Sequence, residues 1–383
     1  MFSPRVLDID RALAGLARRV DVLLDVTPVN TAEAWTASIA TDHTAELDLR
    51  YRPARTDAAD VRSALATLPI DDVEDASMRH LFADKRAELD AQARLVAARG
   101  TAGFLEISLG LYGTADDRLV ALAEGLLDRL PPPDPPGGLV GAADFVRRAE
   151  VEIERYRTQR PDLRASVQVR DDVPSLMVVQ RDLLVGTDSW IPEHRQEALI
   201  HHEVGVHLLT AETGGRQPLE LLEQGLAGYE ETQEALGVLA EYLVGGLDTE
   251  RLRTLAARAV AARALSDGAG FGDLYSVLHG RHGIETRAAW TIAMRMVRGG
   301  GFTKDVIYLR GLVELVDHLA TGGRLEPLLM GRAHLRDLGD LERLLAAGAL
   351  EPPALRPHWL DGDGPRTRLA AIGRGDAPVA RWP

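Results

Sequence analysis

Apolar residues near the start of the chain recur at intervals of three and four positions. They are Val6, Ile9, Leu13, Leu16, Val20 and Leu23. This spacing predicts an amphipathic helix that turns one face toward a core. Longer charged stretches of the same kind follow, for example residues 77–98, and polar turns separate them. We therefore expect residues 1–130 to form an N-terminal helical region.

The helical pattern is interrupted at residues 131–138, which read PPPDPPGG. Consecutive prolines exclude a helix and favour an extended linker. Beyond the linker we expect a second domain over residues 139–355, because helical patterns resume near residues 141–158 and continue almost to its end. Residues 356–383 are rich in Gly, Pro and Arg, so we expect an extended C-terminal tail on the surface.

Three short segments in the second domain have the pattern of β-strands, namely residues 165–169, 176–179 and 183–185. The first alternates apolar and polar residues, and the other two are short apolar runs on either side of a polar tripeptide. This arrangement predicts a hairpin or a small antiparallel sheet. The predicted fold class is therefore mainly α with a small antiparallel β-sheet (α+β).

The composition excludes several classes of function. The chain of 383 residues has a formal net charge of −14 and no cysteine. The charge argues against a nucleic-acid or membrane partner, because both need clustered Lys and Arg. No segment has the roughly 18 uninterrupted apolar residues that crossing a bilayer requires, and the N-terminus lacks the pattern of a signal peptide. We expect a cytoplasmic protein in which any metal site uses His, Asp and Glu.

One segment carries chemically active residues at an informative spacing. Within a predicted helix over residues 192–214, the sequence reads His202-Glu203-Val204-Gly205-Val206-His207. Zinc peptidases carry H-E-x-x-H on a helix, because a spacing of four puts both imidazoles on one face. Here the spacing is five, which separates the side chains by roughly 140° on a regular helix. A one-residue π-bulge would restore a common face, and we expect it at Gly205 because glycine tolerates irregular backbone angles.

With such a bulge, His202 and His207 would bind one Zn²⁺ ion and Glu203 would activate a water molecule. This predicts a zincin-like metallopeptidase core. The alternative is a chance cluster of histidines on a core or surface helix, since short motifs match by accident. His201 could be the ligand in place of His202, but the acid would then stand in the wrong position. We expect His201 to lie beside the ligands or to be exposed.

A catalytic zinc site needs a third protein ligand. The predicted helix over residues 230–245 has one apolar face, and its other face combines Glu234 and Glu241 with small and apolar residues. We expect Glu234 to be the third ligand. Glu241, two turns later, is expected either to orient a ligand histidine or to lie on the surface. Glu230 and Glu231 are expected to be solvated acids of the first turn.

At this point the chain resembles the QEGLA-motif family of zinc peptidases, which includes the microtubule-associated tyrosine carboxypeptidases. The resemblance covers four blocks in order: SLGLYG (108–113), HHEVGVH (201–207), GLAGYEETQEALGVLAEYLVGGL (225–247) and RGGGFTKDVIYLRGL (298–312). It implies that His202, His207 and Glu234 bind zinc and that Glu203 is the base. One departure is that the family's Q-E-G-L-A stands here as Q-E-A-L-G, with the two small residues exchanged and the glutamate retained.

The block over residues 298–312 combines three glycines, several cations and a phenol. A carboxypeptidase needs a fixed cation to bind a terminal carboxylate, and a tyrosine can stabilise the oxyanion. We therefore expect Tyr308 to be catalytic and Lys304, with Arg298 and Arg310, to bind substrate. The alternative is a glycine-rich turn between helices whose cations are solvated.

The predicted function is that of a zinc metallocarboxypeptidase, which would remove a C-terminal residue of a peptide or protein. A bulky or aromatic, tyrosine-like residue is the candidate. Endopeptidase and aminopeptidase action stay open. The alternative from another class is a catalytically silent, zinc-binding regulatory protein that keeps the peptidase fold. Such a protein would not need Glu203 beside the two histidines.

Overall fold

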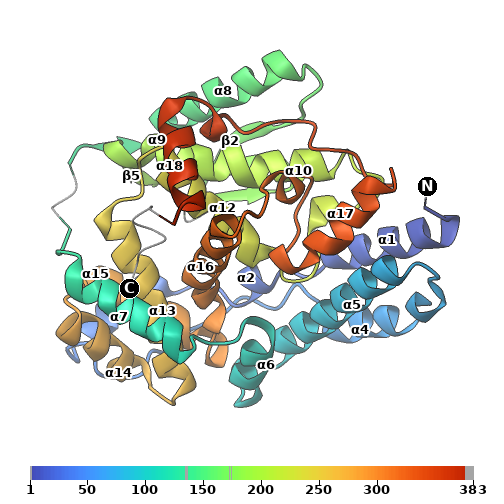
Figure 1. Ribbon diagram of the computed structural model, residues 1–383. Helices are drawn as coiled ribbons and strands as arrows, with labels where there is room; N and C mark the ends of the chain where they lie inside the picture. Colours follow the sequence, from blue (N-terminus) through green and yellow to red (C-terminus); the bar gives the residue numbers. More distant parts are fainter. Residues whose placement is uncertain (1, 134–136, 172, 174, 376–383) are drawn as a thin grey trace.

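Helices dominate the structure, and two small sheets lie at one side (Figure 1). The structure is a computed structural model and describes residues 2–133, 137–171, 173 and 175–375. The predicted fold class, mainly α with a small antiparallel sheet, is confirmed. Part of the predicted linker (134–136) and of the predicted tail (376–383) lies outside the described residues. No helix in the described ranges is long and apolar enough to cross a membrane.

The N-terminal region consists of helices, as its apolar spacing predicts. They are α1 (Pro4–Ala17), α2 (Val22–Asp25), α3 (Thr31–Ile39), α4 (Ala58–Ala66), α5 (Ala76–Ala97), α6 (Gly103–Tyr112) and α7 (Asp117–Arg129). In α1, the side chain of Ser3 caps the first turn and Pro4 starts the helix, where its missing N–H group costs nothing. The predicted stripe is longer than this helix, because α1 ends at Ala17 and Leu23 belongs to α2.

The remaining α-helices follow the predicted linker. They are α8 (Ala142–Gln159), α9 (Gln196–His202), α10 (Leu209–Gly214), α11 (Leu221–Gln224), α12 (Tyr229–Leu243), α13 (Thr249–Ser266), α14 (Phe271–Tyr275), α15 (Thr286–Val297), α16 (Ile307–Ala320), α17 (Leu338–Ala346) and α18 (Asp363–Gly373). Short 3₁₀ turns are η1 (Ile70–Asp72), η2 (Glu193–Arg195), η5 (Arg298–Gly300), η6 (Thr303–Val306), η7 (Glu326–Leu329), η8 (Leu335–Asp337) and η9 (His358–Leu360), and π-helical turns are η3 (Glu203–Leu208) and η4 (Ser276–Arg281).

The two sheets are formed by five short strands. They are β1 (Leu139–Gly141), β2 (Ser166–Arg170), β3 (Leu176–Val179), β4 (Asp182–Gly186) and β5 (Trp190–Pro192). β1 pairs antiparallel with β5, and β3 with β4. The antiparallel β3–β4 pair is the predicted hairpin, and β2 runs parallel to β4, the central strand of the order β2-β4-β3.

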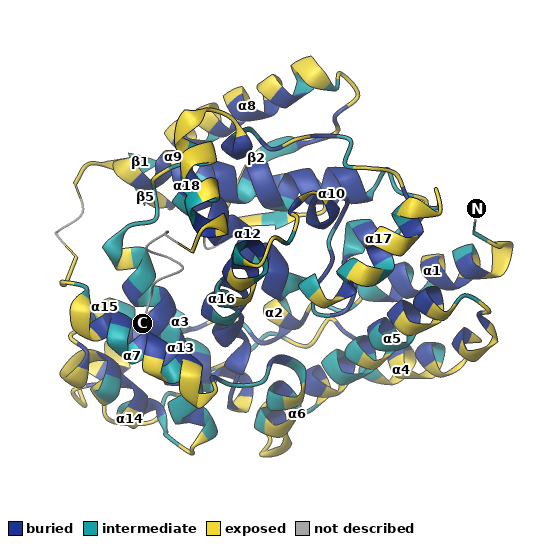
Figure 2. Cartoon of the chain, viewed as in Figure 1, coloured by how far each residue is buried: buried dark blue, intermediate teal, exposed yellow. Residues whose placement is uncertain are grey.

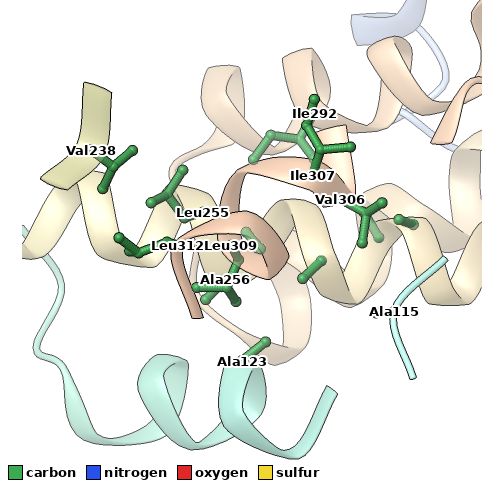
Figure 3. Close-up of a cluster of buried hydrophobic side chains, with 14 of the residues drawn as sticks. Ala115, Ala123, Val238, Leu255, Ala256, Ile292, Val306, Ile307, Leu309 and Leu312 are labelled. Carbon is green, nitrogen blue, oxygen red and sulfur yellow. The ribbon is translucent and has the colours of Figure 1, made fainter. Parts of the chain in front are cut away.

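Three hydrophobic cores hold these elements together. The first joins α7, α12, α13, α15 and α16 through residues such as Ala123, Leu255 and Leu309 (Figure 3). The second packs α1, α4 and α5 against α11 and α17, and the third packs α8 and β4 against α9, η3 and α10. The first two cores join residues on both sides of the proline-rich stretch, while the division into domains there stays a prediction.

Helix α12 lies at the centre of the molecule and is almost wholly buried (Figure 2). It packs against α16 on one side and against α9 and η3 on another. This position places the segment that carries Glu234 beside the segment that carries the histidine pair, although α10 and α11 separate the two segments along the chain. The central helix thus brings the candidate ligands together.

The expectation of an extended C-terminal tail is wrong for most of its described part. The chain forms η9 and then α18, where we expected an extended segment on the surface. Although this segment is rich in Gly, Pro and Arg, it also contains a few apolar residues. Of these, Trp359, Leu360 and Ile372 are buried in the first hydrophobic core. Burial of these three side chains drives the segment onto the body of the protein.

Candidate active site

The predicted helix over residues 192–214 is a composite of four parts. The chain runs through η2, α9, the π-helical turn η3 and α10 without a break. The π-turn spans Glu203–Leu208 and accommodates the extra residue between the two histidines, so the predicted π-bulge is confirmed. The ring centroids of His202 and His207 lie 4.8 Å apart, with the rings at 78° to each other. The five-residue spacing is therefore compatible with both imidazoles binding the same metal ion.

Gly205 lies in this π-turn, but for another reason than the one we expected. Its φ is not positive, so the backbone does not require a glycine for its angles. Instead, the Trp359 indole lies against it: a Cβ at position 205 would be 2.8 Å from Cδ1 of Trp359. Nε1 of the indole donates a hydrogen bond of 3.0 Å to the Gly205 carbonyl. Glycine is needed here for close packing.

Glu234, on α12, faces the two histidines. Its Oε2 lies 3.6 Å from Nε2 of His202 and 3.9 Å from Nε2 of His207. One donor atom from each of the three residues lies within 4.8 Å of the others. Two imidazole nitrogens and one carboxylate oxygen form a ligand set of catalytic zinc sites. These three groups could therefore hold one metal ion.

The pattern of burial marks the same residues. Within η3, Glu203 and His207 are partly exposed while the other four residues are buried. In α12, Glu234 is the one partly exposed residue between Glu231 and Glu241. Solvent therefore contacts these mostly buried helices at Glu203, His207 and Glu234, and a substrate would have to approach from that side.

Glu241 is buried and orients His202, in agreement with the first of its two expected roles. Its Oε1 accepts a hydrogen bond of 2.8 Å from Nδ1 of His202, which leaves Nε2 free to face Glu234. Its Oε2 accepts a hydrogen bond of 2.8 Å from Arg195. A ligand histidine commonly donates its other N–H group to a carboxylate in this way, which fixes its tautomer.

The absence of a side chain at Gly237 leaves room for the His202 ring. A Cβ at this position would overlap the imidazole. In the family pattern this position holds alanine, and the glycine stands two residues earlier. The exchange of the two small residues therefore puts the glycine directly against the ring of a candidate ligand.

The carboxylates of Glu234 and Glu241 stabilise positive charge at the His202 ring. Burial lowers the pKa of His202, but the Glu234 and Glu241 carboxylates outweigh burial and raise it to about 10. Burial lowers the pKa of His207 to about 4, so this imidazole is neutral, the form that binds metals. Burial raises the pKa of Glu203 to about 7, a value that suits a group which takes and returns a proton near neutral pH.

Three residues near the candidate ligands have side-chain partners and are not simply solvated surface groups. His201 is buried, and its Nε2 lies 3.1 Å from Glu197, so its ring is paired outside the ligand group. Glu230 and Glu231 are not the solvated acids that we expected. Glu230 accepts a hydrogen bond of 2.6 Å from Lys304, and Glu231 is paired with Arg310. Both acids therefore form ion pairs with cations of the 298–312 segment.

The segment over residues 298–312 contributes a turn and several buried cations. Gly299, Gly300 and Gly301 all have positive φ, so the turn requires glycine. Arg310 donates to both oxygens of Glu231 and to the carbonyl of Tyr112. Arg298 is buried over the Phe302 ring. The turn that we weighed as an alternative is present, and its cations are paired or buried and not solvated.

Helix α6, which contains most of the SLGLYG block, contacts this segment. The Ser108 hydroxyl accepts a hydrogen bond of 2.9 Å from the backbone N–H of Thr303. The ring of Phe104 packs against Gly299. Helix α6 therefore supports the turn that leads into Tyr308, which explains why a block far upstream belongs to the same motif set.

Sequence reasoning missed two arginines of α13. The guanidinium carbons of Arg251 and Arg258 lie 5.7 Å and 4.9 Å from the centroid of the Tyr308 ring. Nε of Arg251 also lies 3.4 Å from Oε2 of Glu241. The seven-residue spacing, which puts both on one face of a helix, is the only signal in the sequence. It is weak, because arginines on helices are usually solvated.

Comparison with known proteins supports the resemblance. A family model described as microtubule-associated tyrosine carboxypeptidase matches residues 39–375. No curated protein and no solved structure matches the chain. The match includes the histidine pair, α12, the 298–312 segment and α18. The chain therefore belongs to the microtubule-associated tyrosine carboxypeptidase family.

Proposed function

We propose that this protein is a zinc-dependent carboxypeptidase that removes the last residue of a peptide or protein. The observation that carries the proposal is the convergence of His202, His207 and Glu234 beside the partly exposed Glu203. Membership of a carboxypeptidase family supports the direction of cleavage. The same ligand set supports a zincin-like core.

Zinc fits the site better than Mg²⁺ or Ca²⁺, because two of the three candidate ligands are imidazoles. When bound, zinc polarises a carbonyl and lowers the pKa of water. Glu241 keeps Nε2 of His202 directed toward the site, since it accepts the Nδ1 proton. Gly237 and the π-turn set the positions of the two rings.

Glu203 is the proposed general base. It takes a proton from the attacking water as the new C–O bond forms, and it passes that proton to the amine as the C–N bond breaks. Its pKa of about 7, which results first from burial, suits both transfers. Tyr308 is the proposed donor to the oxyanion. Its ring lies close to two guanidinium groups, whose positive charge favours that role.

The proposed substrate is a free peptide or protein C-terminus, with tyrosine or a similar bulky residue in the last position. The family description, which names tyrosine, supports this choice. We propose a cytoplasmic location on the absence of cysteine from the sequence. Nucleic acids and membranes are not proposed as partners because the net charge is −14.

The test combines metal analysis with a library of peptides that differ in their last residue. Wild type and Glu203→Gln are each incubated with the library, and loss of the terminal residue is followed by mass spectrometry. We expect zinc in both proteins, and turnover about 10²- to 10⁴-fold lower in Glu203→Gln. Glu197→Gln is the matched control, because this exposed acid lies on the adjacent helix and pairs with His201.

Two outcomes would contradict the proposal. If no peptide loses a terminal residue in a metal-dependent manner, the protein is not a carboxypeptidase. If zinc is bound fully and Glu203→Gln changes no measurable property, the catalytically silent, zinc-binding protein is the better description.

A further inference from the structure

The face of α13 that meets α16 carries two arginines with unused donors. Arg251 and Arg258 are two helical turns apart and flank the Tyr308 ring. Their side chains are 18% and 16% exposed, so each side chain is mostly but not wholly enclosed. Together with Tyr308, we call this group the arginine pair site.

Each arginine has a carboxylate nearby that another arginine already binds. Nε of Arg251 lies 3.4 Å from Glu241, which is hydrogen-bonded to Arg195 at 2.8 Å. Nε of Arg258 lies 3.6 Å from Asp305, which accepts two hydrogen bonds of 2.6 Å from Arg295. In each case two arginines share one carboxylate, and Arg251 and Arg258 are the more distant partners.

Both Nε atoms are buried and have no hydrogen-bond partner among the described residues. A buried guanidinium donor without an acceptor is costly, and a planar carboxylate is the ligand that matches its geometry. The Glu241 and Asp305 carboxylates are each shared with a second arginine, Arg195 and Arg295, and Arg195 also lies 3.6 Å from Asp248. A further carboxylate at the arginine pair site would supply an acceptor for these donors.

The site adjoins the candidate metal ligands. Glu241, which lies beside Arg251, also accepts the hydrogen bond from His202. Arg251 interacts electrostatically with both Glu203 and Glu234. In a peptide, the terminal carboxylate follows the last amide bond within about one residue length, or about 4 Å. An anion site next to the reaction centre is where that carboxylate would lie.

We propose that Arg251 and Arg258 bind the terminal α-carboxylate of the substrate, with Tyr308 between them. This inference rests on the proposed carboxypeptidase function and specifies how the free C-terminus is selected. The cations that we nominated from sequence fit this role less well. Arg310 is occupied by Glu231 and Tyr112, Lys304 is paired with Glu230, and Arg298 is only 4% exposed.

The test uses one peptide that ends in tyrosine, prepared with a free terminal carboxylate and with a terminal amide. Kinetic constants for both forms are measured with wild type, Arg258→Gln, Arg251→Gln and the two Arg→Lys variants. Arg263→Gln is the matched control, because Arg263 lies on the same helix but pairs with Asp117 and Asp267 on the surface. Thermal melting verifies that each variant is folded.

For the free acid, we expect each Gln variant to raise KM and to lower kcat/KM by about 10- to 100-fold, the effect of losing a charged hydrogen bond. The preference for acid over amide should fall by the same factor, and lysine should restore part of it. Arg263→Gln should behave as wild type. Equal losses for acid and amide, or an unchanged KM, would overturn the proposal.

A binding measurement separates this inference from the proposed function. Calorimetry with Glu203→Gln protein compares the acid and the amide, with and without the additional Arg258→Gln change. If wild type cleaves nothing but the acid form binds more tightly through Arg258, the anion site stands and the carboxypeptidase proposal fails. If Glu203→Gln protein does not distinguish acid from amide, the inference is wrong whatever the turnover of wild type.

Discussion

Nε1 of Trp359 donates a hydrogen bond to the carbonyl oxygen of Gly205, inside the π-turn that separates the two candidate zinc ligands. The indole is fully buried and packs directly on the glycine. A π-turn changes the hydrogen-bond pattern of a helix and is less favourable than the regular form. The contact therefore stabilises the spacing of His202 and His207 from a segment more than 150 residues later in the chain.

This contact predicts that Gly205→Ala weakens metal binding. The added Cβ would push against the indole, and overpacking of this kind costs about 1–3 kcal/mol. The expected result is a lower melting temperature together with weaker zinc binding in chelator competition. Gly110→Ala is the matched control, because Gly110 lies in α6 with open space around it and its substitution should be neutral or stabilising. Normal zinc affinity in Gly205→Ala would show that the indole does not hold the turn.

Glu241→Gln should lower zinc affinity without preventing folding. The neutral amide keeps the size of the side chain but no longer balances Arg195 and Arg251, and it is a weaker acceptor for Nδ1 of His202. Loss of a partner of this kind typically costs 10- to 100-fold in metal affinity, about 1.4–2.7 kcal/mol. The measurement is zinc affinity by competition with a chelator. An unchanged affinity would mean that the His202 ring is held by packing alone.

Gly237→Ala should displace the His202 ring, because the new Cβ would overlap it. Alanine is favoured over glycine in a helix by about 1 kcal/mol, so helix propensity alone predicts a more stable protein. We expect weaker zinc binding and lower turnover instead. Ala235→Gly is the control, since it loses helix propensity two residues away without adding an atom near the ring. If Gly237→Ala binds zinc as wild type does, α12 adjusts more easily than its packing suggests.

Asp10 should make the protein less stable as the pH rises through 6. Burial raises the pKa of this carboxyl from 3.8 to about 6, although the backbone N–H groups of Glu220 and Leu221 oppose the shift. A raised pKa means that the folded state holds the proton more tightly. The stabilisation is complete below pH 4 and is lost by pH 7, with a total of about 3 kcal/mol.

The check for Asp10 is urea unfolding of wild type and Asp10→Asn at several pH values between 4 and 7.5. The amide has no proton to lose, so the free energy of unfolding of the variant should fall less over this range. The difference between the two proteins isolates Asp10 from other titrating groups. Parallel curves would contradict the prediction.

Much of the site could be predicted from the sequence, because it depends on local geometry. Helix periodicity makes a five-residue histidine spacing incompatible with one face, and a π-turn is the local solution. The same periodicity separates Glu234 and Glu241 from the apolar face of their helix. The convergence of His202, His207 and Glu234 agrees with those expectations.

The tertiary structure decided what those residues touch. The pairing of Lys304 with Glu230 and of Arg310 with Glu231, and the role of Gly205, depend on contacts between segments far apart in the chain. The arginine pair site arises because α13 packs against α16, which no periodicity within either helix specifies. The helical C-terminal segment follows from burial of three apolar side chains in a core built elsewhere. The sequence by itself thus determined the chemistry of the site, through local backbone geometry. Only packing between distant helices decided which of the charged side chains pair with one another.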